Sequence, residues 1–299
     1  MEPADAGRRL DAFLAERLAC SRAASRRLLA RGAVRIDGRP LAADAKGVAL
    51  RAGERIEIDA EGDPEAVVPE PECPLAVLAE GDGWLAIDTP AGTPVHPLAP
   101  GERGTALNAL VARHPELQGV GEEGGLRSGV VHRLDVDTSG ALLVATREEA
   151  WRRLRAAFRE HRVAKTYRAI ALGDVPGDGE VELPLVVARH RPAFVRAARE
   201  DELERARTTH TRWRVVERLR GATLLEVETT TGFLHQVRAA LAHLGHPLAG
   251  DRTYAVAGDE TGADRHMLHA SKLGFEEIAA TSPDPEDFAA LRARLRAPA

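Results

Sequence analysis

The sequence predicts an α+β protein, with a small helix–helix–sheet unit ahead of a larger domain built on strands. Two observations favour this fold class. Apolar runs of strand length recur through the chain after residue 74, whereas few segments there have helical periodicity. The first sixty residues begin instead with two helical patterns. At 299 residues, 44% of them apolar, the chain is long enough for one large domain or two unequal ones.

The small unit is predicted from periodicity and from residues that begin or end helices. Its first helix has apolar residues at the spacing of one helix face, namely Leu10, Phe13, Leu14 and Leu18. Ser21 can cap a second helix and Gly32 can end it. Alternating apolar and polar residues predict short strands at 34–36 and 56–58. The dipeptide Asp37-Gly38 favours a tight turn after the first strand.

Arginine is concentrated in the second predicted helix and just after it. Residues 22 to 39 contain one acid, Asp37, and six arginines: Arg22, Arg26, Arg27, Arg31, Arg35 and Arg39. Two like-charged pairs, Arg22 with Arg26 and Arg27 with Arg31, are four residues apart, and each costs a few tenths of a kcal/mol unless a polyanion offsets it. In a chain of net charge −5, this pattern predicts a local polyanion-binding face; a solvated helix face is the alternative.

The segment EGDPEAVVPEPECP is acidic and rich in proline, which predicts a linker. We therefore expect a small unit at residues 1–60, a linker at 61–73 and the larger domain at 74–299.

Six segments of the larger domain have strand-like patterns: VLAEGDGWLAID, SGVVHRL, GALLVAT, VAKTYRAIAL, THTRWRVVE and ATLLEVETT. Thr146 and Glu149 have the spacing of a capping box, and Trp151, Leu154 and Phe158 then fall on one helix face.

A second helix in this domain is expected to begin near His235 and to bury Val237, Leu241 and Leu244. Gly245 should end it.

Composition excludes several classes of protein. No apolar run reaches the roughly 20 residues needed to cross a bilayer, and the first residues do not form a signal peptide. The two cysteines, Cys20 and Cys73, are too few for a disulfide framework or a cysteine zinc site. We expect a soluble, cytoplasmic monomer with no membrane partner.

The segment HRLDVDTSG allows two interpretations. Asp135, Asp137 and Ser139 alternate like ligands in a calcium loop, but the twelfth position is Thr146 where such a loop needs a glutamate, and the flanking segments favour strands over helices. What is left is a carboxylate, Asp135, that enters a bend at 138–140. Taken alone, Asp135 could simply cap its own turn.

HRLDVDTSG also resembles the signature of the RluA family of pseudouridine synthases, His-Arg-Leu-Asp, two residues, Thr-Ser-Gly. Four more segments resemble that family in the same order: TPAGTPVHP, KTYRAIALG, TGFLHQVRAALAHLGHPLAGDRTY and MLHASKL. The similarity covers about residues 74 to 290, and the chain is identified as a member. The resemblance implies an α+β catalytic domain with a central mixed, mostly antiparallel sheet and a cleft.

The resemblance also implies the chemistry. The reaction cuts the N1 glycosidic bond of a uridine and rejoins the base through C5, which needs an ionised carboxylate but no metal and no other cofactor. The motif assigns that role to Asp135, as nucleophile or as base, and gives Arg238 as the cation that keeps it charged. Both alternatives for Asp135 stay open.

A uridine in structured RNA must be flipped out of its stack. The resemblance gives Tyr167 as the residue that stacks on the base, Arg133 as a neighbour able to fill the gap, and Leu268 as part of the uracil pocket. Lys165 shares the strand face of Tyr167, and it is one of only three lysines among 41 basic residues, which marks it as a further substrate-binding candidate.

Residues 8 to 59 resemble a small RNA-binding module shared by a ribosomal protein and tyrosyl-tRNA synthetase. That resemblance implies phosphate contacts from the second helix, hence from Arg22, Arg26, Arg27 and Arg31. A module of this kind ahead of the catalytic domain favours large-subunit ribosomal RNA as substrate, with transfer RNA as the alternative.

Three positions depart from the family pattern: Thr89 and Phe233 replace common cations, and Ala240 replaces a common histidine. We expect substrate choice to be affected and the chemistry to survive. Two other functions stay under consideration, an RNA-binding protein of this fold that has lost catalysis and a calcium- or metal-binding protein. The intact Asp135, Tyr167 and Arg238 argue against the first, and Thr146 argues against the second.

Overall fold

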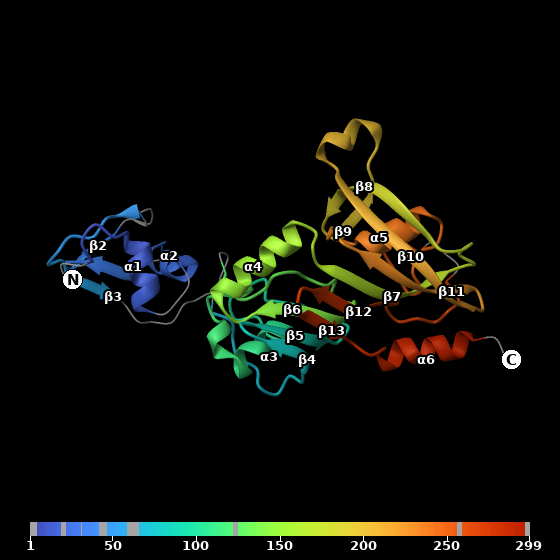
Figure 1. The fold of residues 1–299 in the computed structure, drawn as a ribbon, viewed down its shortest axis with the longest axis horizontal. Coiled ribbons are helices and arrows are strands. Elements are labelled where there is room, and N and C mark those ends of the chain that lie inside the picture. The colour runs from blue at the N-terminus through green and yellow to red at the C-terminus, as the bar shows by residue number, and fades with distance from the viewer. Residues whose placement is uncertain are drawn as a thin grey trace.

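The computed structural model describes residues 5–18, 22–30, 32–41, 47–58, 66–121, 125–255 and 259–296. Its ribbon has a small N-terminal unit and a larger unit formed around one long sheet (Figure 1). The α+β class predicted from the sequence is confirmed. No described helix combines the length and apolar character needed to cross a membrane.

The N-terminal unit has the predicted order of elements. Helices α1 (Leu10–Arg17) and α2 (Arg22–Ala30) precede a sheet of order β2-β1-β3, formed by β1 (Val34–Ile36), β2 (Arg39–Pro40) and β3 (Ile56–Ile58). Asp37 and Gly38 both have positive φ, which forms the tight turn between β1 and β2. The core is formed by Leu10, Phe13, Leu14, Leu29, Val34 and Leu50. Leu18, expected on the buried face, is 40% exposed because α1 ends before it. The expected cap, Ser21, lies outside the described residues.

The described part of the expected linker packs against the larger unit. Val67 is buried with Leu107 and Leu117, and its backbone exchanges two hydrogen bonds with the Gln118 side chain. Asn108 also donates to the carbonyl of Val68. Residues 66–73 of the expected linker therefore pack with the larger unit, and the part of the expected linker at 61–65 lies outside the described residues.

The larger unit contains one ten-stranded sheet. Its order is β4-β5-β6-β12-β7-β11-β10-β8-β9, with β13 paired to β12. The strands are β4 (Ala76–Gly81), β5 (Trp84–Thr89), β6 (Ser139–Ala145), β7 (Ala164–Leu172), β8 (Gly179–His190), β9 (Ala193–Ala197), β10 (Arg207–Leu219), β11 (Ala222–Thr229), β12 (Leu268–Phe275) and β13 (Ile278–Thr281). Only β6 and β12 pair in parallel among the described strands. This mixed, mostly antiparallel sheet matches the expectation.

Helices cover both faces of the sheet at β5 and β6. Leu142 and Val144 of β6 pack in one cluster with α3 (Ala106–Arg113), while Leu143 and Ala145 pack in another with α4 (Glu148–Arg159). Figure 1 shows these two helices on opposite sides of the strands. Alternating side chains of a strand point to opposite faces. This is why all seven residues of β6 are apolar or small and buried.

Two more helices complete the larger unit. Helix α5 (Gln236–His243) packs against β8, β9 and β10, and α6 (Glu286–Leu295) packs with Ile170 and Leu224 of neighbouring strands. Val237 and Leu241 are buried as predicted, but Leu244 follows the end of α5 and is 37% exposed.

Three local expectations were wrong. The capping box at Thr146 does not form, because Arg147 is the N-cap of α4 and its side chain makes no capping hydrogen bond. The negative charges of Glu148 and Glu149 in the first turn stabilise the helix N-terminus instead. SGVVHRL is not a strand, since only Val130 makes a bridge there. The bend expected at 138–140 lies earlier, at Val136 and Asp137.

Candidate active site

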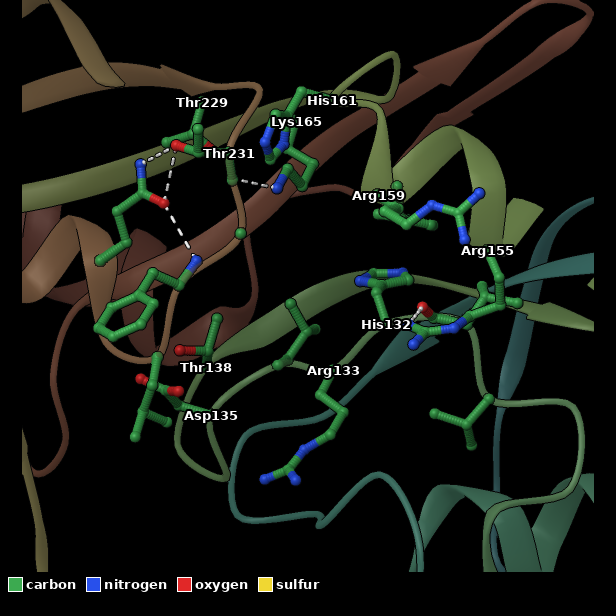
Figure 2. Close-up of a pocket in the computed structure, with 18 of the residues that line it drawn as sticks. His132, Arg133, Asp135, Thr138, Arg155, Arg159, His161, Lys165, Thr229 and Thr231 are labelled. Carbon is green, nitrogen blue, oxygen red and sulfur yellow. Dashed lines mark hydrogen bonds between the residues drawn. The ribbon is translucent and has the colours of Figure 1, made fainter. Parts of the chain in front are cut away.

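A pocket of about 1020 Å³ opens beside the HRLDVDTSG segment. Residues from this segment, from α4, from β7, from the loop before α5 and from β12 line it. Five of the site residues expected from the sequence are among them: Arg133, Asp135, Lys165, Tyr167 and Leu268. Figure 2 shows that Asp135 and Thr138 lie on one side of the view, with Arg155 and Arg159 of α4 on the other.

Asp135 enters a tight turn that leads into β6. The Thr138 amide donates to the Asp135 carbonyl at 2.9 Å, and β6 begins one residue later. Gly140 follows with a φ of +113°, and a Cβ there would lie 2.3 Å from the carbonyl oxygen of Ala270 on β12. The glycine of the motif thus allows the parallel approach of β12, which fixes the turn that carries Asp135.

Arg238 holds the Asp135 side chain from α5. Its Nη1 donates to Asp135 Oδ2 at 2.9 Å, while Nε and Nη2 donate to the two oxygens of Asp251 at 2.7 and 2.9 Å. The Asp251 side chain is fully buried and that of Asp135 is 20% exposed. Burial opposes charge on Arg238 and Asp251, but their ion pair holds the pKa of Arg238 above and the pKa of Asp251 below their usual ranges.

His235 and Tyr254 complete the surroundings of Asp135. Val195 N–H donates to the Tyr254 hydroxyl at 3.0 Å, and that hydroxyl lies 3.1 Å from His235 Nδ1. The hydroxyl that accepts from Val195 has one proton to donate, and donation to Nδ1 fits the His235 tautomer with the ring proton on Nε2. Nε2 lies 3.9 Å from Asp135 Oδ2. Burial lowers the pKa of His235, which favours this neutral form.

Asp251, His235 and Tyr254 were not singled out from the sequence. Asp251 and Tyr254 lie in GDRTY, inside a segment that resembles the family. One available signal was the rarity of tyrosine, because Tyr167 and Tyr254 are the only two in the chain. Burial raises the pKa of each phenol, and the charge of Asp135 adds to this effect in both.

Tyr167 and Lys165 reach the pocket from β7. Burial, followed by the charge of Asp135, raises the pKa of Tyr167 well above its usual value, so the phenol stays protonated at neutral pH. Lys165 is buried and donates to the carbonyl of Thr231. Burial lowers its pKa to about 8. His132 accepts a hydrogen bond from the Leu143 amide at 2.9 Å, and burial lowers its pKa to about 3, with Lys165 and Arg155 contributing.

Positive charge predominates in the pocket. Its lining includes Arg127, Arg133, Arg152, Arg155, Arg159 and Lys165. Asp135 is the one carboxylate among the described residues of this lining. No cluster of three or more potential metal ligands occurs in the described part of the chain. The cations of this lining are suited to bind a polyanion, and Asp135 is the single carboxylate that could act on it.

The remaining expected site residues lie elsewhere. Arg22 and Arg26 are exposed on α2, where Arg26 donates to the buried Asp11 at 3.0 Å, and Arg27 is partly buried there. Arg31 lies outside the described residues. None of the described α2 arginines lines the pocket.

The three departures from the family pattern also differ in position. Thr89 and Ala240 are buried, whereas Phe233 lines the pocket. Of the three, Phe233 is the one placed to contact substrate.

Comparison with known proteins shows the family of this chain. A family model described as RNA pseudouridylate synthase matches residues 83–243, which is more than half of the chain. The chain belongs to this family. As the resemblance of its motifs implied, this pseudouridine synthase is an isomerase. An S4 domain model matches residues 8–43, within the N-terminal unit.

Relatives of this synthase match it over almost its whole length. Ribosomal large subunit pseudouridine synthase D of Xanthomonas campestris is 36% identical, with 97% of this chain and 90% of that protein covered. An uncharacterized RNA pseudouridine synthase of Synechocystis is 35% identical with the same coverage. The structure of human RNA pseudouridylate synthase domain containing 1 has the same fold, at a TM-score of 0.61 and 24% identity over 74% of this chain and 90% of that one.

Proposed function

We propose that this synthase converts uridine to pseudouridine in large-subunit ribosomal RNA, with Asp135 as the catalytic carboxylate. The observation that carries the proposal is the environment of Asp135: one carboxylate in a pocket lined by cations, hydrogen-bonded to a buried arginine that a second acid holds in place. The relatives named for the large ribosomal subunit and the S4 domain support the choice of RNA.

The reaction is an isomerisation in which atoms balance within the nucleotide. The bond from C1′ to N1 breaks, a bond from C1′ to C5 forms, and the proton on C5 is replaced by one on N1. Asp135 can serve as the nucleophile or as the base that removes the C2′ proton, and both roles need the ionised form. Arg238 supports that form through its hydrogen bond to Oδ2.

Other pocket residues are assigned to binding the flipped nucleotide. Tyr167 is proposed to stack on the base, and its protonated phenol can donate to it. Leu268 supplies an apolar contact beside Tyr167. Lys165 is proposed to bind a phosphate, because a backbone carbonyl is its only hydrogen-bond partner among the described residues. Arg133 is exposed and is proposed to occupy the gap that the nucleotide leaves.

The N-terminal unit is proposed to bind RNA phosphates through α2. Arg22 is exposed and is a candidate to bind a phosphate. The charge of Arg26 is partly neutralised by its ion pair with Asp11. Such contacts hold the RNA without specifying its sequence.

The decisive experiment combines mapping with one substitution. Pseudouridine is mapped in ribosomal and transfer RNA from cells with and without the gene, and then with Asp135→Asn in its place. We expect a site in large-subunit RNA to be lost in both altered strains, because the amide has no charge to offer. A site confined to transfer RNA would contradict the substrate assignment. Turnover by the Asn variant within tenfold of wild type, measured as tritium release from C5-labelled RNA, would contradict the role of Asp135.

A further inference from the structure

Helix α4 presents two arginine-bearing faces with different partners. On one face, Arg153 pairs with Glu277 at 2.8 Å and with Glu276 at 3.4 Å, and Arg162 just after the helix also pairs with Glu276. These two arginines are neutralised within the protein. The other face, which we name the cleft stripe, consists of Arg152, Arg155 and Arg159.

The cleft stripe lines the pocket along one side of the helix. Its residues are three and four positions apart, which places them on a single face. Arg152 pairs with Glu148 at 2.9 Å, but Arg155 forms no ion pair with a described residue. The nearest acid to Arg159 is its exposed chain neighbour Glu160, at 3.9 Å. Two cations thus face the pocket with little internal compensation.

Local contacts hold Arg155 in this orientation. One Nη donates to the carbonyl of Val131 at 2.9 Å, and the guanidinium lies 5.9 Å from the centre of the Trp151 ring. These contacts fix the side chain while its other N–H groups stay available. A guanidinium group that is already held in place loses little conformational entropy when it binds a phosphate through two hydrogen bonds.

The pocket is large for a single nucleotide. About 1020 Å³ is the upper end of the range for small-ligand pockets, which is about 300–1,000 Å³. Asp135 lies on one side of the view in Figure 2 and Arg155 and Arg159 lie on the other, with His132 and Arg133 between them. A chain that extends from the nucleotide at Asp135 would therefore pass α4.

We propose that Arg155 and Arg159 bind backbone phosphates of the RNA strand next to the target uridine. This inference rests on the proposed function for its RNA, and it adds a second RNA contact surface that is separate from the S4 unit. The occupant is a phosphodiester backbone because two arginines with little internal charge compensation match the negative charge and the oxygens of a phosphate.

The test compares two double variants of the full chain. Arg155→Gln with Arg159→Gln removes the cleft-facing charges, and Arg153→Gln with Arg162→Gln removes the same charge from the paired face. Binding of an unmodified large-subunit ribosomal RNA transcript is measured over a range of salt. Each phosphate contact with single-stranded RNA contributes about 0.7 to the slope of log affinity against log salt. We expect the cleft variant to reduce that slope by about 1.4 and the paired-face variant to keep the wild-type value.

Two further variants protect the test against misfolding. Arg159→Gln alone removes no hydrogen bond to another described residue and should reduce the slope by about 0.7. Arg155→Lys with Arg159→Lys retains the charge and should keep most of the slope. Equal slopes for the cleft and paired-face variants would overturn the proposal. Because binding is measured without turnover, this result is independent of whether Asp135 is the catalytic group.

Discussion

At the scale of residues, Asp135 depends on groups that are distant in the sequence. Arg238 and His235 approach it from the start of α5, and Asp251 and Tyr254 hold those two residues from the following loop. The geometry leaves Asp135 Oδ1 without a hydrogen bond to a described residue, while Oδ2 accepts from Arg238. In the role that we propose for Asp135, this orientation leaves Oδ1 available to the substrate.

We expect the hydroxyl of Tyr254 to affect activity by influencing which ring nitrogen of His235 carries the proton. Tyr254→Phe keeps the ring that lies 5.2 Å from the Arg238 guanidinium but removes the hydroxyl beside Nδ1. If that hydroxyl donates to Nδ1, its loss lets the ring proton move to Nδ1 and leaves the lone pair of Nε2 facing Asp135. We expect lower kcat, little change in KM and an altered pH profile. His235→Gln can retain a donor and should keep more activity than His235→Ala. Wild-type kcat and pH dependence in Tyr254→Phe would refute this role.

The amine of Lys165 should make RNA binding depend on pH. Because burial lowers its pKa to about 8, the side chain is charged below that pH and neutral above it. A phosphate contact made by Lys165 is therefore present at about pH 7 and disappears as the pH rises to about 9. Lys165→Arg should bind RNA with no such decline, since arginine stays charged. Parallel pH curves for wild type and the arginine variant would show that Lys165 makes no phosphate contact.

At the scale of elements, the parallel pairing of β6 with β12 fixes the turn that carries Asp135. His269 pairs with Ser139 and Ala270 with Gly140 in this short ladder. The approach is so close that it requires glycine at position 140. Neighbouring β12 also pairs with β7, which connects the turn to Tyr167 through one continuous sheet.

Gly140→Ala should reduce both stability and activity. The new methyl group meets the Ala270 carbonyl, and the backbone conformation is unfavourable for alanine, so we expect a decrease of about 2 kcal/mol or more in the free energy of unfolding. Gly245→Ala is the matched control, because that glycine also has positive φ but no atom within 4 Å of a Cβ. Urea unfolding and tritium release measure the two effects. Equal decreases in both variants would show that the contact with β12 is unimportant.

At the scale of the whole molecule, we propose that RNA binding is divided between two positively charged surfaces. One is the arginine-bearing helix of the S4 unit, and the other is the pocket of the larger unit. The larger unit has its own hydrophobic clusters, and the described residues from 66 onward pack within it. It should therefore fold and catalyse without the residues before 59.

Removal of residues 1–58 tests this division. We expect weaker RNA binding and an unchanged kcat at saturating RNA. The slope of log affinity against log salt should decrease by about 0.7 for each phosphate that the truncated protein no longer binds. The slope that remains should respond to the cleft-stripe variants of α4. A truncated protein that binds with the wild-type salt slope would mean that α2 does not touch RNA.

The sequence by itself determined the family, the order of elements in the small unit and most strands of the catalytic sheet. It could do so because helical spacing, strand alternation and the ordered motifs are local properties of the chain. It also indicated Asp135, Tyr167 and Arg238, through motif residues whose types match the chemistry. Segments such as β8, β9, α3 and α6 were not predicted, and SGVVHRL was wrongly assigned to a strand, because pairing and packing with distant segments decide these elements.

Only the tertiary structure decided how the site is supported. Asp251 is 13 residues from Arg238, and Arg238 is 103 residues from Asp135, yet hydrogen bonds connect all three. The two faces of α4 likewise look alike in sequence, because each consists of arginines three to nine residues apart. They differ because Glu276 and Glu277 come from the turn between β12 and β13, more than a hundred residues later, and neutralise only one face. Charge compensation depends on distance in space, which the order of residues along the chain does not specify.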